Sequence, residues 1–428
     1  MTIYRGTKEI GGNCIEVTHE DWRLILDVGM PLVRPDDSSF EWYRSRTLSE
    51  VLEQGDLPRV PHLFDINDPK TAVILTHAHQ DHYGFSGFVQ AATPVFATVG
   101  TIALMRISAM FQANRPPHRE PQALPKSEPF SWGPFTVTAI PVPHSAPDSV
   151  ALFIEAGGRR LFYTGDLRGH GRTAFFFDRL LQNPPNNVDV MVMEGTVLGQ
   201  PPRESMTETD VETRLESLAS AHDDLVLMIC SSQNLDRLVS TYKAAAHSGR
   251  VLVIDLYTAF ILKELLCVSE RLPQFHWRNV RVKYWPNHAK SLADSGNVEF
   301  LYEANPSKIK MPEIAADPRK YFLLTKSNRF LSTIFKPLKN PSRVEVIWSL
   351  WKGYWEKDHY LKNFCDRFGI IPRFIHSGGH ASIHDLTRLV EAVSPKVLVP
   401  IHTFHPEVFP ENFPGVRQLA DGESFPIP

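Results

Sequence analysis

Three histidines and one aspartate lie within six residues of the chain, directly after an apolar run. They are His77, His79, Asp81 and His82 in "LTHAHQDHYG". A strand would project residues 77, 79 and 81 to one side, whereas a tight loop would let all four converge. Imidazole nitrogens and carboxylate oxygens without thiolates suit zinc, manganese or iron, with zinc as the default. The competing explanation is a polar surface turn in a chain that holds 18 histidines.

Further residues of the same chemistry occur where apolar strands run out into polar residues. His144 follows "VTAIPVP", Asp166 follows "RRLFYTG", and His402 lies in "KVLVPIHT". Each one taken singly is more often a turn residue at the end of a strand. Together with the first cluster they supply the ligands that a two-metal centre needs.

The elements that must position these residues change character along the chain. Up to Glu194, short β-rich runs alternate with turns, and Gly157-Gly158 predicts a tight hairpin because glycine tolerates positive φ. Helical patterns separate several of these strands. We therefore expect an α/β sandwich with a largely antiparallel sheet.

After Pro202 the pattern becomes strand, helix and strand in "LVLMIC", "SSQNLDRLVSTYKAAAHSG" and "RVLVIDL". Such a β-α-β unit predicts parallel strands and a Rossmann-like layer. From about Lys362 helical patterns return and lead to the strand before His402. We expect a first domain at residues 1–202 and 361–428, interrupted by an inserted domain at residues 203–360.

Composition limits the classes of function. The chain has 428 residues, a formal charge of −3 and 43 % hydrophobic residues, so a nucleic-acid site would have to be local. Its four cysteines form no C-x-x-C pair, and no apolar stretch is long enough to span a membrane. The N-terminus has no pattern of a signal peptide. We expect a cytoplasmic protein.

The motifs "HAHQDH" and "TGDLRGHG", with His144 and His402, resemble the five ligand motifs of the metallo-β-lactamase superfamily. That family has an αββα sandwich that holds up to two metals. The resemblance implies that His77, His79 and His144 bind the first metal. It implies that Asp81, His82 and His402 bind the second metal, and that Asp166 bridges the two.

The later segments "MEGTVLG", "HSGGHAS" and "PIHTFHP" resemble motifs A, B and C of the β-CASP nucleases, with Glu194, His380 and His402 in order. Within that group the chain is most similar to ribonuclease J, which it matches over nearly its whole length, including "EIGGNCIEV" and "LILDVGM". The extra C-terminal domain of that family is not expected. The fold implied is an αββα metallo-β-lactamase sandwich with an inserted Rossmann-like β-CASP domain.

The resemblance implies a zinc-dependent nuclease with two Zn²⁺ ions, or Mn²⁺ in their place. It would hydrolyse RNA, or single-stranded DNA, with a hydroxide activated by two metals. We assign catalytic roles to Asp81, His380 and Glu194. His380 is the natural general acid, and Glu194 would orient its ring and keep it protonated.

Contacts to the substrate are predicted at Ser231, Ser232 and Asn234, where a helix N-terminus could bind phosphate, and at Ser377. Simple capping of that helix by Ser231 or Ser232 competes with this role. Gly378 stands where the ribonuclease J pattern has serine, so 5′-exonuclease and endonuclease modes both stay open. A homodimer stays open as well.

Two aromatic or basic segments have alternative explanations. Trp348, Trp351 and Trp355 in "WSLWKGYW" could stack bases, although such a stripe more often packs an interior or an interface. The basic stretch 319–343 could follow RNA or form a solvated face. Two rival functions also stay open: a hydrolase of a small ester or phosphodiester, and a β-CASP binding subunit without catalysis.

Overall fold

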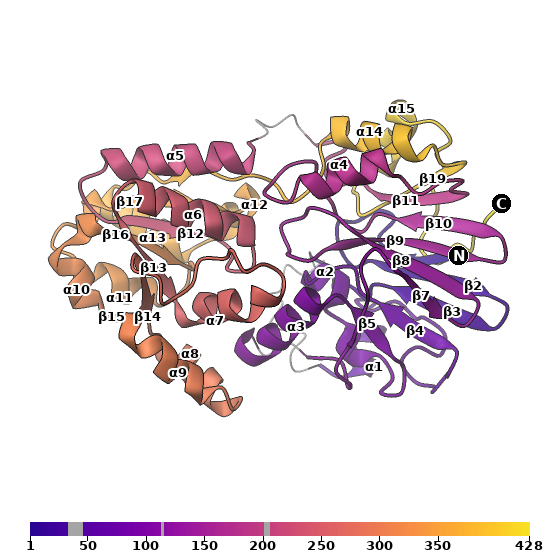
Figure 1. Ribbon diagram of the computed structural model, residues 1–428, viewed down its shortest axis with the longest axis horizontal. Helices are drawn as coiled ribbons and strands as arrows, with labels where there is room; N and C mark the ends of the chain where they lie inside the picture. The colour runs from indigo at the N-terminus through magenta and orange to yellow at the C-terminus, as the bar shows by residue number, and fades with distance from the viewer. Residues whose placement is uncertain (33–45, 113–114, 201–205) are drawn as a thin grey trace. The chain divides into compact units, whose positions relative to one another are not determined.

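The computed structural model describes residues 1–32, 46–112, 115–200 and 206–428. The chain divides into two compact units, one formed by Met1–Pro202 with Gly379–Pro428 and the other by Arg203–Gly378. The first junction falls within 201–205, outside the described residues. Figure 1 shows both units.

The first unit begins with a six-stranded sheet in the order β1-β2-β3-β4-β5-β6. Its strands are β1 (Thr2–Arg5), β2 (Cys14–His19), β3 (Trp22–Leu26), β4 (Thr71–Ile74), β5 (Val95–Ala97) and β6 (Gln122–Ala123). The strands β1 to β3 pair antiparallel, whereas β3 to β6 pair parallel. The sheet is therefore mixed rather than largely antiparallel, because helices and long connections return the chain to the same edge after β3.

The second sheet of this unit has the order β19-β11-β10-β9-β8-β7. Its strands are β7 (Pro129–Trp132), β8 (Phe135–Pro141), β9 (Val150–Ala156), β10 (Arg159–Tyr163), β11 (Val190–Glu194) and β19 (Val397–Ile401). The expected glycine hairpin joins β9 to β10, with φ of 54° at Gly157 and 74° at Gly158. The last segment of the chain rejoins this sheet, since β19 pairs parallel with β11.

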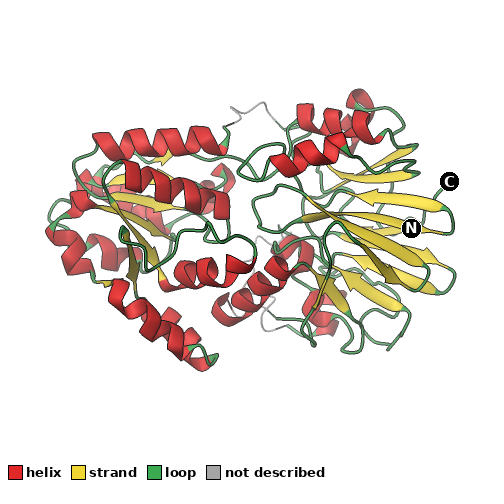
Figure 2. Ribbon diagram, viewed as in Figure 1, coloured by secondary structure: helices red, strands yellow, loops and turns green. Residues whose placement is uncertain are grey.

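Helices cover the outer faces of both sheets, as Figure 2 shows. The first sheet packs against α1 (Leu48–Glu53), α2 (Gln80–Tyr83) and α3 (Val99–Gln112), and the second against α4 (Phe175–Gln182), α14 (Ile383–Val393) and α15 (Phe409–Asn412). A third apolar core, with Ile74 and Val192, fills the space between the sheets. The unit is an αββα sandwich, as the sequence predicted.

The second unit contains a seven-stranded sheet in the order β15-β14-β13-β16-β12-β17-β18. The strands are β12 (Val226–Ile229), β13 (Val251–Asp255), β14 (Val280–Lys283), β15 (Lys308–Ile309), β16 (Tyr321–Thr325), β17 (Glu345–Trp348) and β18 (Arg373–Phe374). Every neighbouring pair runs parallel. The central strands β12 and β16 are buried at every residue, as expected of a sheet covered on both faces.

Helices connect these strands in the Rossmann-like manner that the sequence predicted. They are α5 (Glu208–Ala221), α6 (Leu235–His247), α7 (Leu256–Glu264), α8 (Pro286–Asp294), α9 (Val298–Ala304), α10 (Met311–Ala316), α11 (Leu331–Phe335), α12 (Lys352–Lys357) and α13 (Tyr360–Phe368). Helix α6 begins after the N-cap Asn234, whose side chain accepts from the amide of Arg237. The cap is therefore Asn234, whereas the sequence favoured Ser231 or Ser232.

The return to the first unit comes at residue 379, later than the sequence expectation of residue 361. Strand β18 pairs parallel with β17, and Leu361 and Cys365 on α13 belong to the apolar core of the second unit. A helical pattern alone does not reveal which core its apolar face enters. Throughout the described part of the chain, helices are too short or too polar to cross a bilayer.

Candidate metal centre

The predicted ligands lie at the ends of strands in the first unit. His77 and His79 follow β4, and Asp81 and His82 lie on the short helix α2 that begins after His79. His144, Asp166 and His402 follow β8, β10 and β19. The strands β8, β10 and β19 run in the same direction, because β9 is antiparallel to β8 and β10 while β11 is parallel to β10 and β19. The residues that follow these three strands therefore lie at the same end of the sheet.

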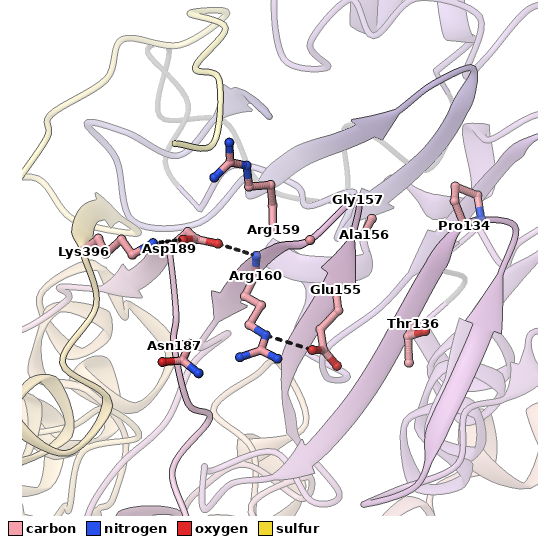
Figure 3. A pocket seen from close by; sticks show the side chains of 11 residues that line it. Pro134, Thr136, Glu155, Ala156, Gly157, Arg159, Arg160, Asn187, Asp189 and Lys396 are labelled. Carbon is pink, nitrogen blue, oxygen red and sulfur yellow. Dashed lines mark hydrogen bonds and ion pairs between the residues drawn. The ribbon is translucent and has the colours of Figure 1, made fainter.

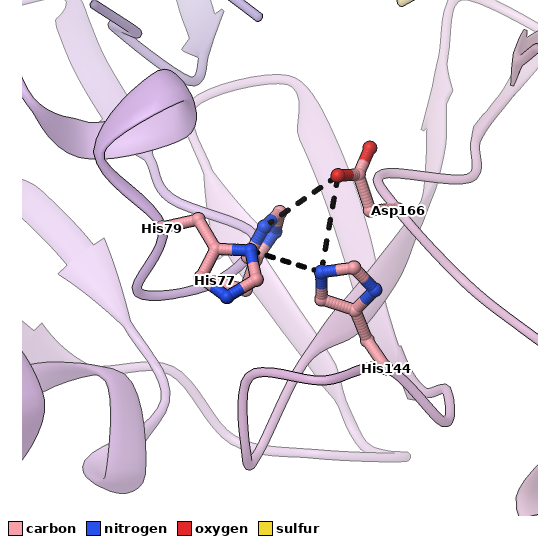
Figure 4. A group of neighbouring side chains, drawn as sticks. All are labelled: His77, His79, His144 and Asp166. Atoms are coloured by element: carbon pink, nitrogen blue, oxygen red, sulfur yellow. Dashed lines mark hydrogen bonds and ion pairs between the residues drawn. The ribbon is translucent and has the colours of Figure 1, made fainter. Parts of the chain in front are cut away.

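The first group of donors consists of His77, His79, His144 and Asp166, whose ligand atoms lie within 4.8 Å of one another. Figure 4 shows the three rings and the carboxylate pointing toward one another. His144 Nε2 lies 3.0 Å from His79 Nδ1, and Asp166 Oδ2 lies 3.8 Å from His77 Nε2 and 3.9 Å from His144 Nε2. The group has the composition and size of a site for one divalent ion.

The second group consists of Asp81, His82, Asp166 and His402, again within 4.8 Å. His402 Nε2 lies 3.2 Å from Asp81 Oδ2 and 3.7 Å from Asp166 Oδ2, and His82 Nε2 lies 3.2 Å from Asp166 Oδ2. Asp166 belongs to both groups. The structure thus brings together all seven residues that the sequence singled out.

The outer ring nitrogens of four histidines are held by hydrogen bonds. Nδ1 of His77 lies 3.1 Å from Thr76 Oγ1, that of His82 2.8 Å from Asp27 Oδ2, that of His144 2.6 Å from the carbonyl of Gly379, and that of His402 2.8 Å from Thr196 Oγ1. With Nδ1–H donating outward, Nε2 is the nitrogen that each ring turns inward, and it carries a lone pair when the ring is neutral. Such outer partners fix the tautomer and direction of metal ligands.

Four inner atoms of the cluster are not satisfied by the others. Among the described residues, Nε2 of His77, Nε2 of His82 and both carboxylate oxygens of Asp166 have no hydrogen-bond partner. The approach of His82 to Asp166 is close enough for an ion pair but lacks hydrogen-bond geometry. Because unsatisfied buried polar groups are costly, a cation that binds all of these atoms would relieve the cost. The donor set therefore fits divalent metal.

Burial and neighbouring charges set the protonation of these groups. Burial lowers the pKa of His77 and His144 and takes that of His79 to about 4, so these rings are neutral and able to bind metal. Burial acts in the same direction on His82, but the carboxylates of Asp166 and Asp27 outweigh it and raise the pKa of that ring. A metal at the second group would therefore displace a proton from His82.

Asp27 is a site residue that the sequence did not single out. It is fully buried, and its carboxylate accepts hydrogen bonds from His82 Nδ1, from the amide and hydroxyl of Thr76, and from Tyr163 at 2.8 Å. The residue has a φ of 61° directly after β3. The main chain at Gly29 passes close to Asp81. A Cβ at position 29 would lie 1.8 Å from the main-chain carbonyl oxygen of Asp81.

His380 and Glu194 lie next to the metal groups. Glu194 is fully buried at the end of β11, where it pairs with Ile401 immediately before His402. Its carboxylate lies 3.1 Å from His380 Nδ1 and accepts from the amides of Leu167 and Thr196. The His380 side chain is 24 % exposed.

The same contacts control the charge of His380. Burial lowers its pKa, but the carboxylates of Glu194 and Asp166 outweigh this effect and raise the pKa to about 9. The ring is therefore protonated at neutral pH. A charged imidazole of this kind, beside two groups of metal donors, can give a proton to a leaving group.

The predicted substrate contacts all belong to the second unit. Ser231 Oγ accepts from the amide of Gln233, Ser232 Oγ lies 2.8 Å from Thr258 Oγ1, and Asn234 caps α6. Ser377 Oγ is buried and has no hydrogen-bond partner among the described residues, while its carbonyl accepts from Arg237. The first two serines and Asn234 have local structural roles, and Ser377 alone presents an unused hydroxyl.

A hollow of about 410 Å³ lies at the opposite ends of the strands, around the β9–β10 hairpin. Figure 3 shows two pairs among its charged side chains: Arg160 with Glu155 at 3.0 Å, and Lys396 with Asp189 at 2.6 Å. The main-chain amide of Arg160 also donates to Asp189. This hollow consequently lacks the converging unsatisfied donors of the histidine cluster.

Comparisons with known proteins agree with this geometry. Residues 37–229 match the β-lactamase superfamily domain. Ribonuclease J of Mycobacterium tuberculosis is 26 % identical over 275 residues, which cover 58 % of this chain and 43 % of that protein. Ribonuclease J of Sinorhizobium meliloti is 23 % identical over 386 residues, or 86 % of this chain and 65 % of that protein. The matches thus span about half to two thirds of these relatives.

A solved structure extends the similarity over the whole chain. The crystal structure of a protein of unknown function from Enterococcus faecalis V583 matches with a TM-score of 0.79 and 25 % identity, covering 99 % of this chain and 98 % of that one. The chain is therefore similar to the β-lactamase superfamily over residues 37–229 and to ribonuclease J over more than half of its length.

Proposed function

We propose that the protein is a ribonuclease that uses two divalent metal ions, zinc by preference, to hydrolyse phosphodiester bonds. One observation carries the proposal: two buried donor groups share Asp166, and the His380–Glu194 pair adjoins them. The similarity to ribonuclease J supports RNA as the substrate. Single-stranded DNA is the alternative substrate of the same chemistry.

In this proposal His77, His79 and His144 hold one ion, Asp81, His82 and His402 hold the other, and Asp166 contacts both. When bound, such a pair of ions supplies Lewis acidity that makes water a nucleophile at neutral pH and stabilises charge on phosphate oxygens. The protein's contribution is to fix the donors. Asp27, Thr76, Thr196 and the carbonyl of Gly379 hold the rings in the tautomer that presents Nε2.

His380 is proposed to donate a proton to the departing alkoxide oxygen. Glu194 accepts from Nδ1–H of this ring, which leaves Nε2–H as the proton to give and favours the charged ring. Glu194 is itself held by the amides of Leu167 and Thr196. It acts as a positioning residue, since its carboxylate reaches the reaction through His380.

The test is cleavage of RNA and DNA strands labelled at either end, each with a 5′-phosphate or a 5′-hydroxyl, by the zinc-loaded protein. We expect metal-dependent cleavage of RNA that EDTA abolishes and zinc restores. The product lengths and the effect of the 5′-phosphate will distinguish endonuclease from 5′-exonuclease action. Absence of cleavage in a protein that holds two zinc equivalents would refute the proposal.

The same assay separates the two rival functions. Hydrolysis of a small chromogenic ester or bis-nitrophenyl phosphate without cleavage of RNA would indicate an enzyme for small substrates. Binding of RNA without hydrolysis, in a protein holding well under two metal equivalents, would indicate a binding subunit. The second outcome is not expected, because every position of both donor groups carries a side chain that can bind metal.

A further inference from the structure

Several large apolar side chains are exposed around helix α12 and strand β18 of the second unit. Trp351 and Tyr354 are each 49 % exposed, Phe374 is 41 % exposed and Ile371 is 81 % exposed. Trp348, in contrast, is only 2 % exposed and belongs to the core. The tryptophans of "WSLWKGYW" thus divide between an interior role and a surface role, both of which the sequence left open.

The exposed rings are held in place by neighbouring residues. Trp355 packs edge-on against both Trp348 at 5.2 Å and Phe374 at 5.5 Å, which ties α12 to β18. The ring of Trp351 lies over Gly353, where a Cβ would come within 2.2 Å of it. Tyr354 stands edge-on to Trp351 at 5.4 Å. The rings therefore form an ordered platform, and glycine at 353 makes room for it.

Phe374 also lines a groove of about 430 Å³ between α5 and β18. Its lining includes two arginines and two hydroxyl residues, Arg214, Arg373, Thr213 and Ser217, of which Thr213 donates its hydroxyl to the carbonyl of Thr209. β18 is the last strand in the order of its sheet, so the groove follows the sheet edge. Phe374 thus joins the aromatic platform to a groove lined by cationic side chains, and we call the two together the α12–β18 face.

The cations of this face lie among its rings. Lys352 Nζ is 5.9 Å from the centre of the Phe374 ring, and Lys362 Nζ is 5.5 Å from that of Trp355. Arg373 also lies 3.3 Å from Glu345, which offsets part of its charge. Exposed lysines are disfavoured at the centre of protein interfaces, whereas rings alternating with cations suit single-stranded nucleic acid. The chemistry favours a polynucleotide over a protein partner.

We propose that the α12–β18 face binds single-stranded nucleic acid, with phosphates near Arg214 and Arg373 and bases stacked on Phe374, Trp351 and Tyr354. The inference rests on the proposed function for the class of ligand. It adds a binding surface formed by residues other than the metal donors and the serines discussed above. Long single strands would gain affinity from this face, whereas cleavage chemistry would not depend on it.

The test measures binding to the full chain in an Asp81→Ala background, which prevents cleavage. Fluorescence anisotropy with a labelled oligouridylate of about 20 nucleotides gives the Kd. Trp351→Ala should weaken binding about fivefold or more, the loss expected for one stacked base, and Trp351→Phe should restore most of it. Tyr302→Ala is the matched control, since Tyr302 on α9 is 74 % exposed in the same unit.

Salt dependence tests the cationic part of the face. The double variant Arg214→Gln with Arg373→Gln should reduce the slope of log K against log salt by about 0.7 for each phosphate that a guanidinium no longer neutralises. The proposal would be overturned if the double variant kept the salt slope of the parent protein and Trp351→Ala kept its Kd. If Trp351→Ala changes the oligomeric state of the protein in solution but not its affinity for RNA, the face serves self-association. That result would also overturn the proposal.

The binding result for the α12–β18 face can be distinguished from the cleavage result that tests the proposed function. If the parent protein fails to cleave RNA but Trp351→Ala still weakens binding, the nuclease proposal fails and the α12–β18 face stands. If the parent protein cleaves RNA and the variants bind it normally, the reverse holds. The binding assay needs no catalysis, so neither result depends on the other.

Discussion

The two ends of the second sheet in the first unit differ in whether their polar and charged side chains are paired with one another. Around the β9–β10 hairpin, Arg160 pairs with Glu155 and Lys396 pairs with Asp189. At the other end, beyond β10, Asp166 lies among buried rings with both oxygens lacking hydrogen bonds within the described chain. The hairpin end thus holds two ion pairs, whereas the histidine end leaves donors open to a ligand. The open end is where chemistry is expected.

The largest effect should come from Asp166→Asn, because this residue contributes to both donor groups. We expect RNA cleavage to fall below detection and the bound zinc to fall below two equivalents, as measured by elemental analysis of the dialysed protein. Asp81→Ala should likewise abolish cleavage while changing RNA affinity little. Full activity in either variant would show that the histidine end of the sheet is not where catalysis takes place.

The next largest effect is predicted for His380→Ala. Loss of a general acid typically costs ~10²–10⁴-fold in rate. We expect single-turnover cleavage to slow by this order while zinc content stays at the parent level. Glu194→Gln should produce a smaller loss, since it leaves the ring in place but removes the charge that holds its proton. A parallel loss of zinc in His380→Ala would instead make the residue a metal ligand.

A smaller effect is expected for Asp27→Asn. The variant keeps the shape of the side chain but weakens its hydrogen bond to His82, and changes of this kind typically lower metal affinity about 10–100-fold. Competition with a chromophoric chelator measures the affinity directly, without relying on activity. Asp189→Asn, at the hairpin end, is the matched control and should leave zinc affinity unchanged. Equal zinc affinity in Asp27→Asn and the parent protein would show that Asp27 does not support the metal ligands.

The smallest effect is expected for the stability of Asp189→Asn itself. Burial raises the pKa of Asp189, but Lys396 and the amide of Arg160 outweigh it and hold the pKa below its ordinary value. The carboxylate therefore stabilises the fold above about pH 4, and this contribution is lost as pH falls through its lowered pKa. The Lys396 side chain is 63 % exposed, so the variant should lose at most about 1 kcal/mol at neutral pH. Urea unfolding of both proteins at pH 7 and at pH 3 would detect a larger difference at pH 7. An equal difference at both values would show that the charge is not its source.

The clustering of the seven candidate residues could be predicted from sequence because each one follows an apolar strand in a short recognisable motif. Asp27 could not, although it also ends a strand. Its role depends on β3 lying beside β4, which brings its carboxylate to Thr76 and His82. A single aspartate after a strand carries no sign of that pairing.

Some features of the fold could likewise be predicted from the sequence, and others could not. The αββα sandwich and the parallel inserted layer follow from local patterns of apolar residues. The mixed pairing of the first sheet and the late return at residue 379 depend on which distant strands meet. The residues from Tyr360 to Phe374 form an ordinary amphipathic helix and a two-residue strand, and only their packing assigns them to the second unit.

The central claim is that the cluster around Asp166 is a metal centre that hydrolyses RNA. The most direct measurement is the rate of cleavage of labelled single-stranded RNA as zinc is titrated into the metal-free protein, with bound zinc measured in parallel. We expect cleavage to rise with occupancy and to stop rising at about two equivalents per chain, as two-ion chemistry requires. A fully occupied protein that leaves the RNA intact would contradict the claim.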